Sequence, residues 1–387
     1  MKSFKGFERP DGAAGARNHL AIIPSVACAN GVVAAIAREV PEAVPLYHGH
    51  GCGRGGARDL EVHFRSLAGL GRNPNVGAAL VVGLGCEVIK AEYLTYDIAA
   101  TGKPAEFFEI QSEGGSRRAA KKGAGIAREL LGKLESAKRT DIAIDRLTLG
   151  LKCGGSDSLS GVTANPAVGE VTDRVVAAGG TVILTENTEM IGTSHILERR
   201  ACCPEVAADV KSMVETADRL THDIMGPLAS LVIAPGNMEG GMSSIQEKSL
   251  GCIAKAGTSP IMEVVDYGVA PSSRGLILMD APGYDMESMT ALAAAGVQVI
   301  VFTTGRGNPM GYPTVPVIKI ASNTRLYEAM EDDIDLDAQG ALEGRTLADV
   351  GNDVEELLAR VLDGEETKAE VNRQDGIACL YTVNPAF

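Results

Sequence analysis

The sequence has no tryptophan, and aromatic residues make up only 4% of its 387 positions. A platform of aromatic rings on which nucleic-acid bases could stack is therefore not expected. Positive charge is also in the minority, because 36 lysines and arginines face 50 aspartates and glutamates and leave a net charge of −14 at pH 7. This balance argues against nucleic acid and anionic membrane surfaces as partners, since both repel an acidic protein. A small anionic substrate is still compatible with it, because a local group of arginines can oppose the overall field.

Long hydrophobic runs are missing as well. No apolar run approaches the ~20 residues that a membrane span needs. The opening residues, MKSFKGF, contain no apolar segment of the kind found in secretory signals. We therefore expect a cytoplasmic protein without a membrane partner, in which the eight cysteines are reduced thiols.

Common cofactor and nucleophile motifs are not found either. The turn Gly83-Leu84-Gly85 lacks the third glycine of the dinucleotide-binding fingerprint. The sequence also has neither a P-loop nor a Gly-x-Ser-x-Gly elbow. A nicotinamide cofactor is therefore not expected.

What the sequence does contain is an alternation of apolar, strand-like runs with helix-like segments, together with 46 glycines. We expect strands at residues 20–26, 80–84, 147–151, 181–184, 230–234, 276–279, 297–303 and 315–320. We expect helices at residues 31–40, 87–99, 116–139, 204–220 and 286–295, and an acidic, helical surface segment at 331–370. This order predicts an α/β fold of two Rossmann-like domains with mostly parallel sheets, at residues 1–138 and 139–387. Ligands bind at the carboxyl ends of parallel strands, so we expect the site in the glycine-rich loops there.

Four cysteines each follow the end of a strand-like run: Cys28, Cys52, Cys86 and Cys153. A single free cysteine is as well explained as a small buried hydrophobic residue. Four of them beside glycines favour a site, because soft thiolate ligands suit a thiophilic metal or an iron–sulfur cluster. The other four cysteines, Cys202, Cys203, Cys252 and Cys379, are expected to serve packing alone.

Two histidines precede Cys52 in the run His48-Gly49-His50-Gly51-Cys52. In an extended chain His48 and His50 point to the same side, as paired metal ligands would. The alternative is that they are ordinary turn histidines. Cys86 lies at the mouth of a helix, which favours its thiolate form. We predict a metal site formed or lined by His48, His50, Cys52, Cys86 and Cys153.

Other polar groups also follow predicted strands. Glu186 and Glu189 lie after one of them, and Gly305-Arg306-Gly307 lies after another. Backbone amides together with a guanidinium group are a common way to hold a carboxylate or a sulfonate. Arg306 is therefore expected to anchor an anionic substrate.

Several longer motifs resemble those of the altronate/galactarate dehydratase family. They are residues 6–12, Arg17-Asn18-His19, residues 83–87, 152–157, Ala164-Asn165-Pro166, 247–251 and 302–307. The resemblance extends from residue 6 to about residue 370. It implies an iron-dependent lyase that acts on 2-hydroxy acids by β-elimination.

The chain departs from the sugar-acid dehydratases of that family in two respects. It starts where their extra small N-terminal domain would end, which implies that a separate small alpha subunit supplies this domain, as in two-subunit sulfolactate-cleaving members. The loops at residues 237–244 and 308–313 also differ, where substrate contacts are plausible. The resemblance thus implies the large subunit of a lyase that converts (2R)-3-sulfolactate to pyruvate and bisulfite. The alternative is a two-subunit altronate- or galactarate-type dehydratase.

The resemblance also suggests roles for particular residues. Lys248 or Glu247 would be the base, and Arg306 would hold the anionic substrate. Substrate contacts are predicted for Arg54, Asn165, Gly305, Gly307 and Asn308. The cofactor would be Fe(II), with an iron–sulfur cluster as the open alternative, and the enzyme is expected to be oligomeric. A non-catalytic scaffold subunit also stays open, although it would have little use for so many polar residues at strand ends.

Overall fold

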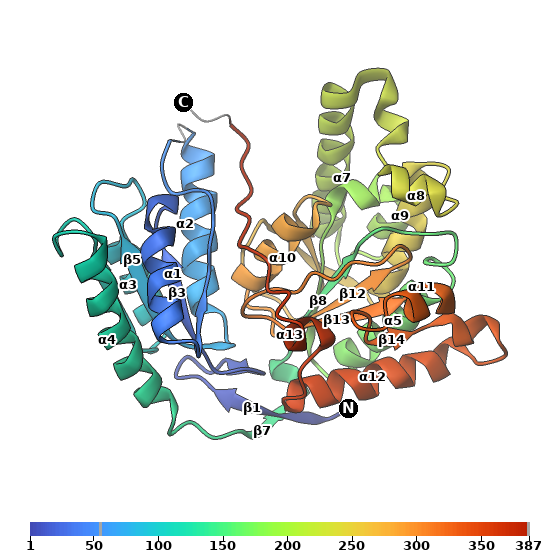
Figure 1. Cartoon of the computed structure of the whole chain (residues 1–387). Coiled ribbons are helices and arrows are strands. Elements are labelled where there is room, and N and C mark those ends of the chain that lie inside the picture. Colours follow the sequence, from blue (N-terminus) through green and yellow to red (C-terminus); the bar gives the residue numbers. More distant parts are fainter. Residues whose placement is uncertain (54–55, 385–387) are drawn as a thin grey trace.

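The computed structural model describes residues 1–53 and 56–384 and shows an α/β protein with two parallel sheets (Figure 1). The N-terminal unit comprises β3 (His19–Pro24), α1 (Asn30–Glu39), β4 (Ala43–Pro45), α2 (Ala57–Arg72), β5 (Val76–Gly83), α3 (Ala91–Ala99), β6 (Ala105–Glu109) and α4 (Ser116–Leu134). Its sheet has the order β4-β3-β5-β6, and every pairing is parallel.

The two faces of this sheet are covered by different helices, as the two-residue period of β3 requires. Leu20 and Ile22 pack in one apolar cluster with residues of α1 and α4. Ala21 and Ile23 point to the opposite face and pack with residues of α2 and α3. The alternation of side chains along one strand therefore forms two separate cores.

The C-terminal unit carries the larger sheet, whose seven strands are all parallel in the order β10-β11-β9-β8-β12-β13-β14. Its strands are β8 (Thr148–Cys153), β9 (Thr181–Leu184), β10 (Ile261–Asp266), β11 (Gly275–Asp280), β12 (Val299–Thr304), β13 (Val317–Ala321) and β14 (Leu336–Asp337). Its helices are α5 (Ala164–Ala177), α6 (Ser194–Glu198), α7 (Pro204–Met225), α8 (Pro235–Glu239), α9 (Ile245–Ile253), α10 (Asp285–Ala294), α11 (Thr324–Ala329), α12 (Leu347–Asp363) and α13 (Lys368–Val371). Helices α5 and α12 pack on one face, and α10 packs on the other.

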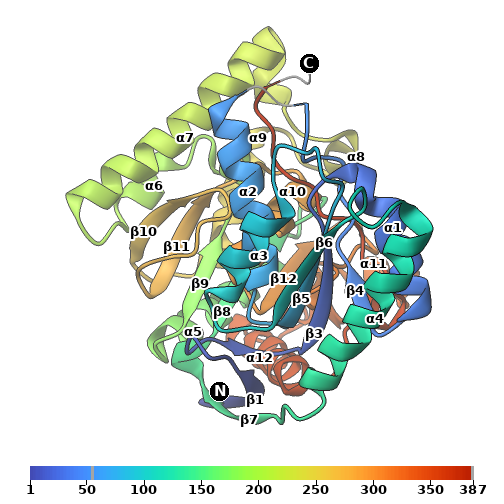
Figure 2. The same ribbon diagram turned by 90° about the vertical axis from the view of Figure 1, so that its left-hand side faces the viewer.

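The N-terminal and C-terminal units are joined at three places. Helices α2 and α10 pack together, so one apolar core includes residues of both units. A small antiparallel sheet of β2 (Ala14–Gly15), β1 (Ser3–Glu8) and β7 (Thr140–Ala143) lies beneath both (Figures 1 and 2). The C-terminal segment returns to the N-terminal unit, where the amide of Ala378 donates to the carbonyl of Tyr47 at 2.9 Å.

One predicted strand is wrong. Residues 230–231 end the 3-10 helix Gly226–Leu231, and residues 232–234 lead from it into α8, so the segment does not join a sheet. Ile233 instead packs with Ile191, Met242 and Ile245 in a small apolar cluster beneath the end of α7. A short apolar run predicts that a segment is buried but not which elements it packs against, and here it packs against helices. Within the described residues, no helix combines the length and apolar character needed to cross a membrane.

Candidate functional site

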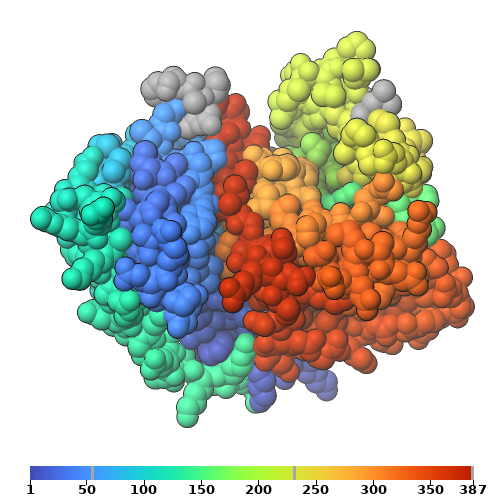
Figure 3. All heavy atoms as spheres, viewed as in Figure 1, coloured from blue at the N-terminus to red at the C-terminus, as the bar shows by residue number. Residues whose placement is uncertain are grey.

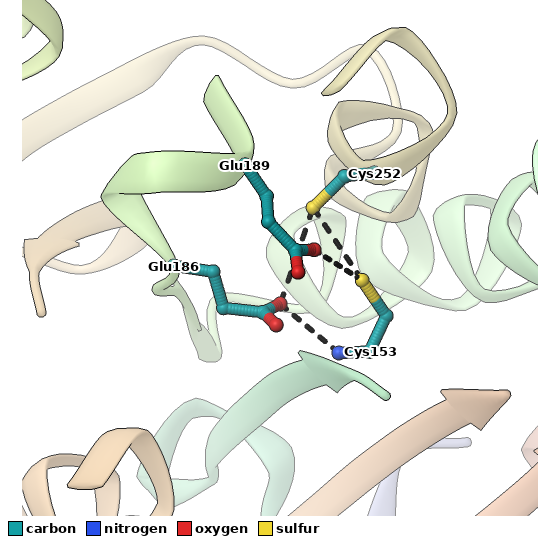
Figure 4. A group of neighbouring side chains, drawn as sticks. All are labelled: Cys153, Glu186, Glu189 and Cys252. Atoms are coloured by element: carbon teal, nitrogen blue, oxygen red, sulfur yellow. Dashed lines mark hydrogen bonds between the residues drawn. The ribbon is translucent and has the colours of Figure 1, made fainter. Parts of the chain in front are cut away.

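Buried thiols and carboxylates meet at the carboxyl edge of the seven-stranded sheet. Strand β8 ends at Cys153, and the segment after β9 supplies Glu186 and Glu189. Helix α9 lies across these strand ends and supplies Lys248 and Cys252. We call Cys153, Glu186, Glu189 and Cys252 the Cys–Glu cluster (Figure 4).

The donor atoms of this cluster are close enough to share one ligand. One sulfur or oxygen atom from each residue lies within 4.8 Å of those of the other three, and all four side chains are buried. The Cys153 thiol donates to Oε2 of Glu189 at 2.8 Å, and its Sγ lies 3.7 Å from Sγ of Cys252. Within the described residues, this is the one group of at least three such side chains with the spacing of a metal site.

Glu186 is held by an unusual backbone conformation. Its φ of +78° lies in the left-handed region, which costs a residue with a side chain about 1 kcal/mol or more. In that conformation, Oε2 of Glu186 accepts a hydrogen bond from the amide of Cys153 at 3.0 Å. Backbone strain of this kind is concentrated at functional positions, and here it directs the Glu186 carboxylate toward the other residues of the cluster.

Three lysines surround the cluster. Lys152 and Lys255 both bind Glu186, Lys255 at 3.0 Å, and the Lys248 ammonium lies 2.5 Å from Glu189. Lys152 also pairs with Asp285 at 2.8 Å, and Lys255 donates to Sγ of Cys252 at 3.2 Å. Lys152 and Lys255 are fully buried, which is rare for lysine unless it is paired.

The charges of these groups depend on one another. Burial would lower the pKa of Lys248, but the Glu189 carboxylate outweighs burial and holds that pKa above its usual value. Burial would raise the pKa of Glu189, but Lys248, Lys152 and Lys255 outweigh it and lower this pKa to about 2. The hydrogen bond with Cys252, together with burial, raises the pKa of Cys153. At neutral pH the chain alone therefore holds the cluster with an ionised, ion-paired Glu189 and a neutral Cys153.

This donor set fits a divalent metal. The three ammonium groups are balanced by the carboxylates of Glu186, Glu189 and Asp285. The two cysteines, as thiolates, would add a charge of −2, which a divalent metal ion would neutralise. Thiolate and carboxylate together suit a borderline first-row metal such as Fe(II). A cluster with four cysteine ligands does not fit here, because the group found in the described residues has two thiols.

A pocket of about 250 Å³ opens beside the cluster at Lys248. Its lining includes Ser156, Ser160, Asn165 and Glu247. Asn165 is buried and fixes the wall, because it donates to the carbonyl of Gly251 at 2.9 Å and accepts from Thr303 at 2.6 Å. Lys248 therefore connects a pocket of substrate size with the buried cluster.

The predicted anion loop lies next to this pocket, after β12. Gly305 packs so closely on Asp157 that an added Cβ would lie 2.3 Å from Oδ1 of Asp157. Arg306 pairs with Glu239 of α8 at 2.9 Å. Gly307 has a φ of +88°, and the Asn308 amide donates to Asp285 at 2.9 Å, which links the loop to Lys152.

The structure does not bring the five predicted metal ligands together. Cys153 belongs to the Cys–Glu cluster, whereas His48, His50, Cys52 and Cys86 lie in loops of the N-terminal unit. Both ring nitrogens of His48 are engaged, with Pro24 O at 2.6 Å and with the amide of His50 at 3.1 Å. Cys52 and Cys86 are exposed. Arg54 lies outside the described residues.

Three members of the cluster were not predicted as ligands. Cys252 is buried, as expected for a packing residue, but its sulfur faces Cys153 rather than an apolar core. Its spacing of four residues from Lys248 places both on one face of a helix, and this signal could have found it. Glu186 and Glu189 stood out as polar residues after a strand, but nothing in the sequence showed which thiols they would meet.

Comparisons with known proteins match nearly the whole chain. Residues 6–135 match the family described as the second domain of D-galactarate dehydratase/altronate hydrolase. Residues 144–384 match the family described as the C-terminal domain of D-galactarate/altronate dehydratase.

Individual relatives fall into two functional groups. The chain is 40% identical over 352 residues to the altronate dehydratase of Bacillus subtilis (strain 168), covering 87% of the chain and 69% of the relative. It is 34% identical over 385 residues to the (2R)-sulfolactate sulfo-lyase subunit beta of Chromohalobacter salexigens, covering 98% of each. It is 36% identical over 385 residues to the galactarate dehydratase (L-threo-forming) of Escherichia coli (strain K12), covering 94% of the chain and 73% of the relative.

Proposed function

Because the chain belongs to the D-galactarate/altronate dehydratase family, we propose that it is the large subunit of a lyase that acts on a 2-hydroxy acid by metal-assisted β-elimination. The proposed substrate is (2R)-3-sulfolactate, and the products are pyruvate and bisulfite. The observation that carries this proposal is the position of Lys248, which lines a small pocket and contacts the buried Cys–Glu cluster.

Elimination requires removal of the proton at C2 and departure of the group at C3. A divalent metal held by Cys153, Cys252, Glu186 and Glu189 would act as a Lewis acid that acidifies the C2 proton of a bound 2-hydroxy acid. The Lys248 ammonium lines the pocket as a fixed positive charge. Because negative charge develops on the substrate as the C2 proton departs, a fixed cation in this pocket suits the reaction, and sulfite, as an anionic leaving group, needs no protonation.

Of the two residues suggested as the base, Glu247 fits better than Lys248. Hydrogen bonds from Ser243 hold the pKa of Glu247 below its usual value, so Glu247 is an ionised acceptor on the pocket wall. The pKa of Lys248 is raised, so its amine carries a proton at neutral pH. We therefore assign proton removal to Glu247 and charge stabilisation to Lys248.

A direct assay tests the substrate. The chain, reconstituted with Fe(II) and the small partner subunit, should release sulfite and pyruvate from racemic sulfolactate. No sulfite, together with formation of a 2-keto-3-deoxy acid from altronate, would overturn the assignment. The Lys248→Met variant should lose activity, and Lys248→Arg should recover part of it, because arginine restores the charge. A scaffold role would instead leave elimination intact in both variants.

The second candidate is a two-subunit sugar-acid dehydratase, which the 40% identity to an altronate dehydratase favours. Its leaving group is hydroxide, which must be protonated as it departs. The Lys248 ammonium could supply that proton, so the same residue serves either reaction. The two reactions differ in the polar contacts that the substrate requires, and the sulfite assay separates them.

The proposal also covers the cellular location, the subunits and the domains of the enzyme. We infer a cytoplasmic oligomer that contains a small alpha subunit, with Rossmann-like domains at residues 1–138 and 139–387. A subunit named beta among the relatives supports the presence of a partner. Copurification of an untagged small subunit with the tagged chain would test it.

A further inference from the structure

A second hollow, of about 550 Å³, adjoins the pocket at Lys248. Asp157 lines both, so the two spaces share a wall. The second hollow lies at the ends of β12 and β13, where Arg306 and Arg325 both contribute to its lining. Figure 1 shows α11, which carries Arg325, on the same side of the C-terminal unit as α8 and α9.

The two arginines differ in their partners. Arg306 binds Glu239, and this pair is exposed, with 41% and 68% of the two side chains accessible. Arg325 is exposed and, within the described residues, makes no hydrogen bond or ion pair. In a chain of net charge −14, an arginine without a carboxylate partner beside a second arginine forms a local positive field.

The carboxylate in the wall of the hollow, Asp157, binds neutral donors and neither of the two arginines. Oδ1 of Asp157 accepts hydrogen bonds from the amide and the hydroxyl of Ser160 and from the hydroxyl of Ser322, at 2.7 to 2.8 Å. Oδ2 of Asp157 accepts from the Asn323 amide at 2.9 Å. Because Asp157 is buried and saturated by these donors, the guanidinium groups are the charged groups presented to a ligand.

The ion pair with Glu239 shows that the Arg306 guanidinium binds a carboxylate. The Glu239 carboxylate accepts a hydrogen bond from the guanidinium at 2.9 Å, and the next residue, Gly240, lines the hollow. An exposed ion pair of this kind contributes only about 0–1 kcal/mol, so an anion held by two arginines can displace it. The helix that carries Glu239 is short and is followed by Gly240 and Gly241, whose φ is +97°.

We propose that this hollow binds a second anionic group of the substrate, and that Arg325 selects dianionic 2-hydroxy acids over monoanionic ones. The inference rests on the proposed function and narrows the substrate class to acids with a second carboxylate or sulfonate. The first carboxylate would lie in the pocket at Lys248, and the second anion would replace Glu239 on Arg306 and pair with Arg325. Sulfolactate and galactarate belong to this class, whereas altronate does not.

Equilibrium binding to the Fe(II)-reconstituted complex tests the inference. Malate and lactate share the 2-hydroxy carboxylate and differ in a second carboxylate, and sulfolactate carries a sulfonate in the corresponding place. Titration calorimetry should show malate binding about 10-fold or more tightly than lactate, and sulfolactate, which an active complex consumes, is compared through the KM of its cleavage. Arg325→Gln should remove most of this preference without weakening lactate, and Glu239→Gln should tighten the dianions by removing their competitor.

A matched control is Arg274→Gln, because Arg274 is an exposed arginine that pairs with Asp145 away from the hollow. It should leave all three affinities unchanged. The inference is overturned if the unmodified complex binds lactate as tightly as malate, or if Arg325→Gln weakens both equally. Tight sulfolactate binding that Arg325→Gln abolishes, in a complex that eliminates nothing, would instead refute the proposed reaction and leave the anion site standing. The reverse result, sulfite release with no dianion preference, would refute only the anion site.

Discussion

At the residue scale, the three lysines around the Cys–Glu cluster determine its charge. Lys255 is fully buried and pairs with Glu186, so its removal leaves a buried carboxylate whose one remaining ion pair within the described residues is with Lys152. Breaking a buried pair in this way costs about 3–5 kcal/mol. We predict that Lys255→Met lowers the free energy of unfolding of the metal-free chain by that amount, measured by urea denaturation.

The control for Lys255→Met is Lys211→Met. Lys211 pairs with Glu215 at 3.7 Å on the exposed face of α7, and such helical pairs contribute about 0.5 kcal/mol or less. Similar losses for both variants would contradict the view that the lysines compensate buried charge.

His48 gives the protein a predictable sensitivity to acid. Burial lowers the pKa of His48 to about 4, against 6.5 for a free histidine, and its hydrogen bonds to Pro24 and His50 require the neutral ring. As the pH falls below 6.5 the unfolded chain binds the proton first, so stability falls between pH 6.5 and about 4 and then levels off. The shift corresponds to about 3 kcal/mol.

The measurement compares unfolding of the unmodified chain with His48→Gln at pH 7 and pH 4. Carboxylates titrate in both proteins, so the difference between the two pH dependences isolates His48. The unmodified chain should lose about 3 kcal/mol more than the variant over this interval. Parallel curves would show that His48 is accessible to protons in the folded state.

Some of these residue properties could be predicted from the sequence, and others could not. Cys153 and Arg306 follow strands, and parallel strands must end at a common edge, so their placement near a site was predictable. The pairing of Cys153 with Cys252 was not, because 99 residues separate them and no local pattern records which helix crosses the strand end. His48 was assigned to a metal because sequence spacing does not reveal the carbonyl and amide that occupy its nitrogens.

At the element scale, close packing of the loop after β12 limits what can stand at Gly305. A Cβ there would lie 2.3 Å from the carboxylate of Asp157, which is itself held by four donors. We predict that Gly305→Ala lowers the free energy of unfolding by about 1–3 kcal/mol and reduces elimination, because Arg306 moves with the loop.

Gly132→Ala is the matched substitution with the opposite expected sign. Gly132 is exposed in α4, and a Cβ there would meet no atom within 4 Å. Alanine in a helix is favoured over glycine by about 0.5–1 kcal/mol, so this variant should gain stability. Equal effects of the two substitutions would contradict the argument from packing.

Seven of the eight strands expected from the periodicity of the sequence are present in the structure. The strands at β3, β5, β8, β9, β11, β12 and β13 are confirmed by the structure, because each is a buried apolar run between turn residues. The segment 230–234 has the same composition, but it lies between α7 and α8, where no strand edge is available. Composition therefore predicts burial, and only the fold decides whether a sheet or a group of helices provides it.

At the scale of the whole molecule, the two parallel sheets present two carboxyl edges, and each was a candidate for the metal. The edge of the N-terminal unit carries His48, His50, Cys52 and Cys86, and the edge of the C-terminal unit carries the Cys–Glu cluster. Figure 3 shows the surface hollowed between the N-terminal unit and the protruding α7 of the C-terminal unit. Only the second edge gathers buried donors at metal-binding distances within the described part of the chain.

The most direct test is anaerobic titration of the metal-free complex with Co(II), followed by absorption spectroscopy, because thiolate ligands give a charge-transfer band that carboxylates and imidazoles do not. We predict that the band appears in the unmodified complex, weakens with Cys153→Ser or Cys252→Ser, is lost when both are substituted, and persists with Cys52→Ser and Cys86→Ser. A band that survives both substitutions in the Cys–Glu cluster and disappears with Cys52→Ser or Cys86→Ser would place the metal at the other sheet and contradict this account.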